Sequence, residues 1–155
     1  MPKLDLSAIT PVNRTAYPPP HDKAVDGRWQ QRFGALAGFT HLGANYVTLD
    51  PGAWSSQRHW HHGEDELVVM LAGEAVLVED ANGENGGETV IRPGDICVWP
   101  AGAANGHCLQ NRSDRPCTFL AVSAGDAAAG GVYSDIDMVF GPGGFNRKDG
   151  TPYQS

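Results

Sequence analysis

The stretch RHWHHGEDELVVMLAGE, residues 58–74, decides the fold. It sets His59, His61 and His62 just before three acidic residues, and an apolar run follows without a break. Side chains at i and i+2 of a strand share one face, so an extended segment 57–62 points His59 and His61 one way and His62 the other. Imidazoles beside an apolar interior are costly unless they are paired or bound to a cation. The stretch therefore predicts a strand with a chelating histidine pair at the edge of a β-type core.

A third metal donor is expected on the strand that follows the histidines. Glu66 has the parity of Val68 and Met70, which we expect to face the same way, whereas Asp65 has the opposite parity. Glu64 shares the parity of Glu66 but falls in the turn. We interpret Glu64 and Asp65 as a solvated acidic turn whose charge raises cation affinity nearby.

Composition favours one all-β domain. The chain has 155 residues, with 20 Gly and 11 Pro placed between short apolar runs, which is typical of many turns joining short strands. The clearest strands are expected at 44–50 and in two runs within 67–80 that are hinged at Gly73, followed by a turn in ANGENGG at 81–87. We expect a sandwich or barrel, because stacking or closure protects strand edges.

Three segments are expected along the chain. Residues 1–28 form an extended N-terminal arm, in which YPPPH at 17–21 runs as polyproline. Residues 29–124 form the barrel, and residues 125–155 form a C-terminal strand or arm docked on it. Alternation over 134–139 favours a final strand or a docked arm there.

Charge and cysteine content exclude several classes of function. The formal net charge of −7, without a Lys/Arg-rich block, argues against a nucleic acid or an anionic membrane as partner. The N-terminus has no secretory pattern, so we expect a soluble, cytoplasmic protein. Cys97, Cys108 and Cys117 are odd in number and lack Cys-x-x-Cys spacing, which favours free thiols.

Two sets of spaced residues carry a family resemblance. The first set is Gly52, His59-x-His61, Glu66 and Gly73. The second lies in PGDICVWPAGAANGHCLQN at 93–111 and comprises Gly94, Pro100-x-Gly102, a histidine and Asn111. Together they resemble the two conserved motifs of the cupin superfamily, and the whole chain looks like small single-domain bacterial cupins of uncharacterised function. The resemblance implies an all-β, cupin-type double-stranded β-helix, that is, a jelly-roll barrel.

The motifs depart from the family pattern in two places. Gly52 lies one residue further from His59 than usual, and Asn105 stands where the family has its last histidine, with His107 two residues later. We interpret Asn105-Gly106 as a two-residue insertion, which preserves strand parity. If the insertion instead displaces His107, only three protein ligands remain.

The resemblance implies a metal site and leaves the reaction open. His59, His61, Glu66 and His107 resemble the three-His, one-Glu set of catalytic cupins, which would hold one divalent transition metal per chain, Zn, Fe, Mn, Ni, Co or Cu. Candidates to line a ligand pocket are Gln57, Met70, Trp99 and Asn111, although a tryptophan is more often core or interface.

Three functions are compatible with such a site. The first is a metal-dependent enzyme, a dioxygenase, isomerase or lyase, acting on a small polar oxygen-donor substrate such as a hydroxy acid, diketone or sugar acid. Glu66 would then either leave the metal or act as proton acceptor. The second is a non-catalytic protein that binds or senses a small ligand, and the third has a purely structural metal. We also expect a homodimer, paired through the arm at 1–28.

Overall fold

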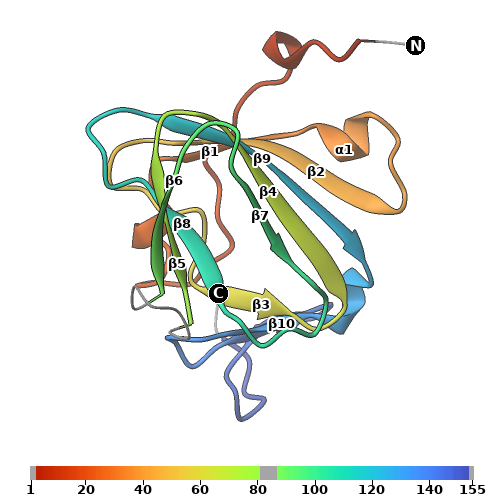
Figure 1. The fold of residues 1–155 in the computed structure, drawn as a ribbon. Coiled ribbons are helices and arrows are strands. Elements are labelled where there is room, and N and C mark those ends of the chain that lie inside the picture. The colour runs from red at the N-terminus through yellow and green to blue at the C-terminus, as the bar shows by residue number, and fades with distance from the viewer. Residues whose placement is uncertain (1–2, 81–86, 154–155) are drawn as a thin grey trace.

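The computed structural model describes residues 3–80 and 87–153, and its strands form two antiparallel sheets that face each other (Figure 1). In spatial order, the strands of one sheet are β1 (Arg28–Arg32), β2 (Leu42–Leu49), β9 (Cys117–Gly125), β4 (Glu64–Ala72) and β7 (Ile96–Trp99). Those of the other sheet are β12 (Gly144–Asn146), β11 (Val139–Gly141), β10 (Gly131–Tyr133), β3 (His59–His61), β8 (His107–Gln110), β5 (Ala75–Glu79) and β6 (Glu88–Ile91). The predicted all-β jelly roll is confirmed.

The helical elements are short. They are α1 (Phe33–Leu36) and the 3-10 turns η1 (Leu6–Ala8), η2 (Lys23–Val25) and η3 (Ala127–Ala129). Gly and Ala dominate the sequence around α1 and η3, and no apolar helical stripe accompanies them. None of the helices over 3–80 and 87–153 is long and apolar enough to cross a membrane.

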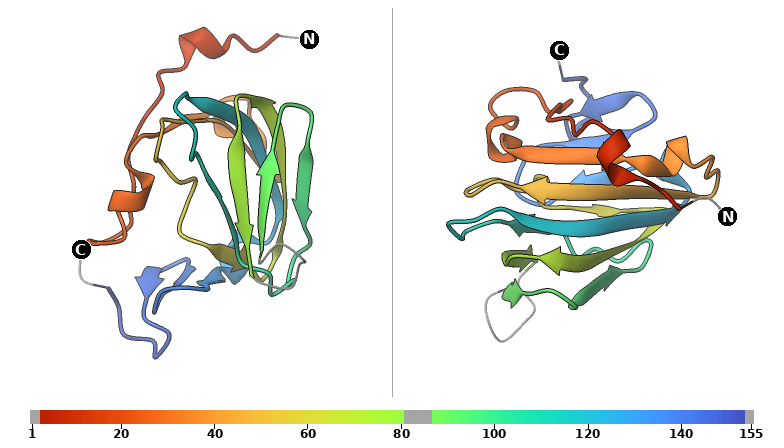
Figure 2. Two further views of the ribbon diagram at one scale, coloured as in Figure 1. Left: turned by 60° about the vertical axis from the view of Figure 1, so that its left-hand side comes forward. Right: turned by 90° about the horizontal axis from the view of Figure 1, so that it is seen from above.

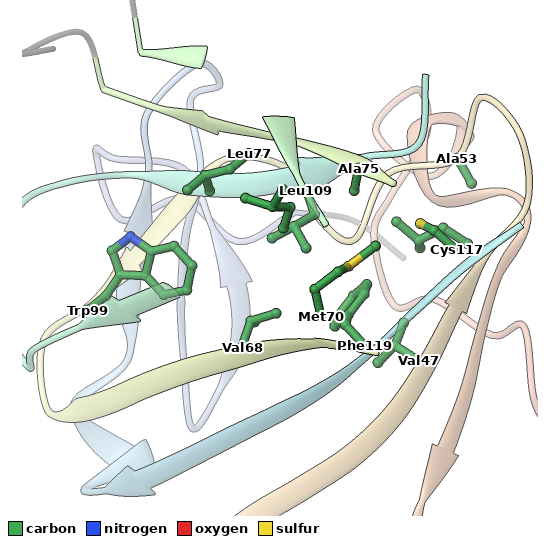
Figure 3. Close-up of a cluster of buried hydrophobic side chains, with 12 residues drawn as sticks. Val47, Ala53, Val68, Met70, Ala75, Leu77, Trp99, Leu109, Cys117 and Phe119 are labelled. Carbon is green, nitrogen blue, oxygen red and sulfur yellow. The ribbon is translucent and has the colours of Figure 1, made fainter. Parts of the chain in front are cut away.

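An apolar core lies between the sheets (Figure 3). Trp99 lies at one end of this core, and Ala53 and Cys117 lie at the other. Strand register builds the core in layers, because Val47 of β2 pairs with Phe119 of β9, which in turn pairs with Met70 of β4. The buried members are Val47, Leu49, Ala53, Val68, Met70, Ala75, Leu77, Ile91, Trp99, Leu109, Cys117 and Phe119.

The predicted hinge at Gly73 is confirmed. Gly73 has φ of 73°, and a Cβ there would lie 2.8 Å from the backbone Cα of Cys117. Only glycine fits both the left-handed conformation and the close approach of β9. The chain thus leaves the five-stranded sheet at the end of β4 and enters the seven-stranded sheet in β5. The turn expected at 81–87 lies largely in residues 81–86, outside the described part of the chain.

The N-terminal segment lies along β1, at the edge of the five-stranded sheet (Figure 2). Val12 bridges Gln30, and the Gln31 side chain donates hydrogen bonds to the carbonyls of Leu6 and Ile9, each at 2.7 Å. The expected extended polyproline run at 17–21 is wrong. The His21 N–H donates to the Pro18 carbonyl at 2.9 Å and closes a tight turn, since prolines at 19 and 20 accept turn conformations and have no N–H of their own to place.

The C-terminal segment adds strands to the seven-stranded sheet beside β3. Its strands flank residues 134–138 rather than including them, so the strand expected over 134–139 is wrong in position. Met138 is fully buried and its N–H donates to the Ile136 carbonyl at 2.8 Å, which makes this segment a connection between β10 and β11. Pairing of two copies of the chain through residues 1–28 stays a prediction.

Candidate metal centre

Three side chains from two consecutive strands, one in each sheet, bring their donor atoms together inside the barrel. His59 and His61 belong to β3, and Glu66 belongs to β4. His59 Nε2 lies 3.1 Å from His61 Nε2, which lies 3.5 Å from Glu66 Oε2. Within the described residues these three side chains offer donors that all lie within 4.8 Å of one another. The group can hold a metal ion.

His107 adjoins this group from the neighbouring strand β8. Its position pairs directly with His59 across β3 and β8, and its Nε2 lies 2.9 Å from Glu66 Oε2. Asn105, which stands where the family pattern has a histidine, instead donates from its side chain to Glu79 at 2.9 Å. The structure thus places His107, and not Asn105, beside the Glu66 carboxylate.

The outward nitrogen of each histidine faces an oxygen. Nδ1 of His59 lies 2.9 Å from the Gln57 carbonyl, and Nδ1 of His107 lies 3.1 Å from the Asn105 carbonyl. Nδ1 of His61 lies 3.2 Å from Glu64 Oε2, but the alignment is too poor for a hydrogen bond. Metal-ligating histidines usually donate their second N–H to such a carbonyl or carboxylate, which fixes the tautomer and frees Nε2 for the metal.

The donor spacing fits a transition metal. Ligands at about 2.1 Å from one ion in octahedral or tetrahedral geometry lie about 3.0–3.4 Å apart. The Nε2 and Oε2 contacts of 3.1 Å, 3.5 Å and 2.9 Å fall around that range. Imidazole and carboxylate donors suit Zn, Fe, Mn, Ni, Co or Cu and do not select among these metals.

The pKa values of His59 and Glu66 favour the protonation states that bind metals. Burial lowers the pKa of His59 to about 4, so its ring is neutral near pH 7. Burial acts to raise the pKa of Glu66, but the hydrogen bond with His107 and the nearby histidines outweigh it, and the pKa is lowered. A neutral imidazole beside an ionised carboxylate is the state that a cation requires.

Aromatic side chains from β7 and the C-terminal strands enclose the histidines. The Trp99 ring stacks on His107 with centroids 3.8 Å apart. From the C-terminal strands, Tyr133 lies 5.5 Å from His59 and Phe140 lies 5.2 Å from His61, measured between ring centroids. Glycine is required at position 131 beneath this wall, because a Cβ there would collide with the Phe140 ring.

The donor group opens into a cavity of about 240 Å³ within the barrel. Glu66 is the only acidic residue in its described lining. Neutral or cationic polar side chains from several elements face the same space: Tyr17, Arg28, Gln30, Asn45, Ser55, Ser56 and Ser123. Apolar side chains complete the wall: Val47, Val68, Leu109, Phe119 and Ala121. A small polar molecule fits such a space better than an apolar one.

The four residues expected to line a ligand pocket lie outside this lining. Gln57 is buried and donates to the His21 carbonyl, Met70 is a core residue, and Asn111 donates to the Leu49 and Arg115 carbonyls. Trp99 packs in the core and borders a second hollow, which Glu66 and Val98 also line. None of the four borders the cavity at the donor group, and their part in a ligand pocket stays a prediction.

Sequence reasoning misplaced Glu64 and missed the polar residues of the cavity. Glu64 is the first residue of β4, its side chain is 15% exposed, and it lies against His61 rather than in a solvated turn. Arg28, Asn45 and Ser123 went unnoticed although each shares strand parity with an inward neighbour. The missed signal at Asn45 and Ser123 is a polar residue in phase with an apolar series in its strand. Arg28 carries no such signal, because its in-phase neighbours in β1 are polar.

Comparison with known proteins identifies the family. A cupin domain model matches residues 45–123, which is half of the chain and includes all four candidate donors. The chain belongs to the cupin superfamily. Among curated proteins, no sequence matches this cupin.

Solved structures agree with the fold and add names of relatives. A sugar phosphate isomerase from a cupin superfamily of Silicibacter pomeroyi is 42% identical, with TM-score 0.89, covering 99% of this cupin and 98% of that chain. An Acidithiobacillus ferrooxidans protein provisionally named a sugar phosphate isomerase is 25% identical, with TM-score 0.66, covering 77% and 74% of the two chains. The polyketide cyclase RemF of Streptomyces resistomycificus, 18% identical with TM-score 0.63 over 80% and 79%, shares the fold alone.

Proposed function

We propose that this cupin is a metal-dependent enzyme acting on a small polar molecule with oxygen donors, such as a hydroxy acid, a diketone or a sugar acid. The observation that carries the proposal is the cluster of His59, His61 and Glu66 at the wall of a polar cavity. A purely structural metal would need no such space beside it. The proposal includes His107 as a fourth ligand, since its Nε2 reaches the same carboxylate oxygen as His61.

The bound metal would supply Lewis-acid polarisation of a substrate oxygen. The chain's own contribution is to hold neutral imidazoles in place, with the outer nitrogens of His59 and His107 held by backbone carbonyls. Residues that enclose the group, including Phe140 and Trp99, limit the access of water. Electrostatic interactions within the cavity are stronger for that reason.

Isomerisation is the reaction that we place first among oxygenase, isomerase and lyase chemistry. Support comes from the 42% identical relative, which is named a sugar phosphate isomerase. Such a reaction moves a proton from the carbon beside a carbonyl to the carbonyl carbon itself, while a second proton passes between the two oxygens. Glu66 is the acidic residue in the described cavity lining, so we assign it as the group that accepts the carbon-bound proton and returns it.

Non-catalytic binding of the same kind of molecule is the alternative. It uses the same cavity and metal, and differs only in turnover. Conversion of a bound sugar acid or sugar phosphate separates the two, because a binding protein returns the molecule unchanged.

The decisive experiment begins with elemental analysis of protein purified without a metal-chelating tag. We expect near one transition metal per chain, and strong loss of it in His107→Ala. Metal-loaded protein is then incubated with aldose and ketose phosphates and with sugar acids in deuterated water. Incorporation of deuterium at carbon supports the proton-transfer role, and its loss in Glu66→Gln with some metal retained assigns that role to Glu66. Absence of metal after reconstitution would overturn the proposal.

A further inference from the structure

One charged side chain in the cavity has no role in holding the metal. Arg28 begins β1, is 9% exposed and lines the same cavity as the histidines. Its Nη1 donates to the Ser55 carbonyl at 2.7 Å, while its Nε is buried and meets no hydrogen-bond acceptor among residues 3–80 and 87–153. Burial lowers the pKa of Arg28, but a guanidinium in a protein keeps its charge.

Arg28 also lacks a counter-charge. Five other arginines pair with carboxylates, as Arg58 does with Asp80 and Asp135, yet no ion pair within the described part of the chain includes Arg28. Two further arginines without an ion pair, Arg14 and Arg32, are exposed to water. A buried cation without an anion is strongly unfavourable, and a retained one calls for a partner. Because Arg28 borders an internal cavity, a ligand in that cavity can supply the missing anion.

We propose that Arg28 is the subsite for an oxyanion, the phosphate or carboxylate group of the molecule whose oxygens meet the metal centre. The inference rests on the proposed function, because it names a group carried by that substrate. Guanidinium matches the planar or trigonal faces of both oxyanions, and charge-assisted hydrogen bonds are the strongest that a side chain offers. Gln30, Asn45 and Ser123 line the same cavity and add neutral polar groups without a competing negative charge.

The competing explanation is structural. Arg28 holds the Ser55 carbonyl, and the next residue, Ser56, lies 3.2 Å from Nδ1 of His59, so Arg28 could serve only to position the segment before β3. Arg28→Gln separates the two explanations, because glutamine keeps an N–H donor for Ser55 and removes the charge. A purely positioning residue would change metal content, whereas an anion subsite would change anion affinity alone.

The test titrates inorganic phosphate and acetate into the full chain by calorimetry, in metal-loaded and metal-stripped form, and measures metal content in parallel. Arg28→Gln should weaken binding of the preferred anion by about tenfold or more, with metal content unchanged. The matched control is Arg115→Gln, whose side chain is 87% exposed and should leave both quantities unchanged. Tighter binding of phosphate or of acetate identifies which oxyanion the subsite takes.

Two results overturn the subsite. Either neither anion binds the wild-type protein, or Arg28→Gln binds the preferred anion as tightly as the wild type does. If Arg28→Gln does not fold, Arg28→Lys keeps the charge without the forked geometry and should show intermediate affinity; wild-type affinity there overturns the proposal. Anion binding lost in Arg28→Gln by a protein that never takes up metal would defeat the proposed function and leave the subsite standing.

Discussion

The two ends of the barrel interior use the same strands and carry opposite kinds of side chain. Along the inward face of β4, Met70 and Val68 belong to the core and Glu66 belongs to the metal centre. On β8, Leu109 lies in the core, and His107 lies at the other end, against the carboxylate. Alternation along a strand sets which residues face inward. Position along the strand then decides whether an inward residue stabilises the core or binds the metal.

The side chains at the two ends therefore contribute differently to the free energy of unfolding. Apolar side chains stabilise the fold in proportion to the area they bury. Buried imidazoles and carboxylates do not, because they lose their hydrogen bonds to water and must replace them with bonds to protein groups or to a metal. We therefore expect substitutions at the apolar end to change the free energy of unfolding, and substitutions at the polar end to change metal affinity.

Leu49→Ala should have the largest effect on stability. Leu49 is fully buried at the apolar end, so the substitution should lower the free energy of unfolding by about 2–5 kcal/mol, measured by urea denaturation. Val98→Ala is the matched control, since Val98 is 64% exposed and the change should stay within about 0.5 kcal/mol. Metal content per folded chain should be unchanged in both variants. Loss of metal in Leu49→Ala would show that the two ends are not separable.

His59→Ala tests the opposite end. It removes one of three clustered donors, so we expect metal affinity to fall by about 100-fold or more, since even outer partners of ligands are worth about 10–100-fold. His62→Ala should keep the metal, because His62 has the opposite parity, is exposed and packs against Trp60. The measurement is competition with a chelator, followed by elemental analysis. Equal loss in both variants would contradict the division by strand face.

Much of this comparison could be predicted from the sequence. Parity in a strand is local, so residues 57–62 alone place His59 and His61 on one face, and Gly73 marks the reversal between β4 and β5. Motif spacing brought Glu66 and His107 into the same set although they lie on different strands. The cupin fold itself follows from these two motifs and is confirmed by the family match.

The cavity could not be predicted in the same way. Its lining combines Tyr17 from the N-terminal segment with β1, β2 and β9, and their meeting depends on register between strands distant in sequence. The expected pocket residues Gln57, Met70 and Asn111 do not border this cavity, because motif membership indicates a place in the fold and says little about depth along the barrel. Glu64 was misplaced because the turn before β4 is tighter than its acidic composition suggests.

Glu64→Gln tests whether Glu64 belongs to the polar end. The Glu64 carboxylate lies 3.2 Å from Nδ1 of His61 without a well-aligned hydrogen bond, so neutralising it should weaken metal binding by up to about tenfold, at the low end of the range for outer partners of ligands. Asp65→Asn is the matched control, because Asp65 faces outward and accepts from the Ala101 N–H at 2.8 Å, a contact that an amide oxygen can keep. Chelator competition on both variants gives the answer. Equal affinities would mean that Glu64 only contributes charge to the surface.

Glu79→Gln should have the smallest effect. Glu79 lies between the two ends and contacts a residue of each. Its Oε1 accepts from the Trp99 indole and from the Asn105 amide, each at 2.9 Å, and Asn105 in turn holds His107 through its carbonyl. Glutamine keeps an acceptor oxygen and loses the charge, which should cost about 1 kcal/mol of unfolding free energy.

The matched control for Glu79 is Glu88→Gln, which weakens an exposed pair with Arg112 and should cost less. A loss of about 1 kcal/mol shared between the ends would lower metal affinity by less than about fivefold. Denaturation and chelator competition on the same preparations separate the two contributions. Loss of affinity beyond about fivefold with little loss of stability would place Glu79 at the metal end, because support reaching the core through Trp99 must appear in the unfolding free energy.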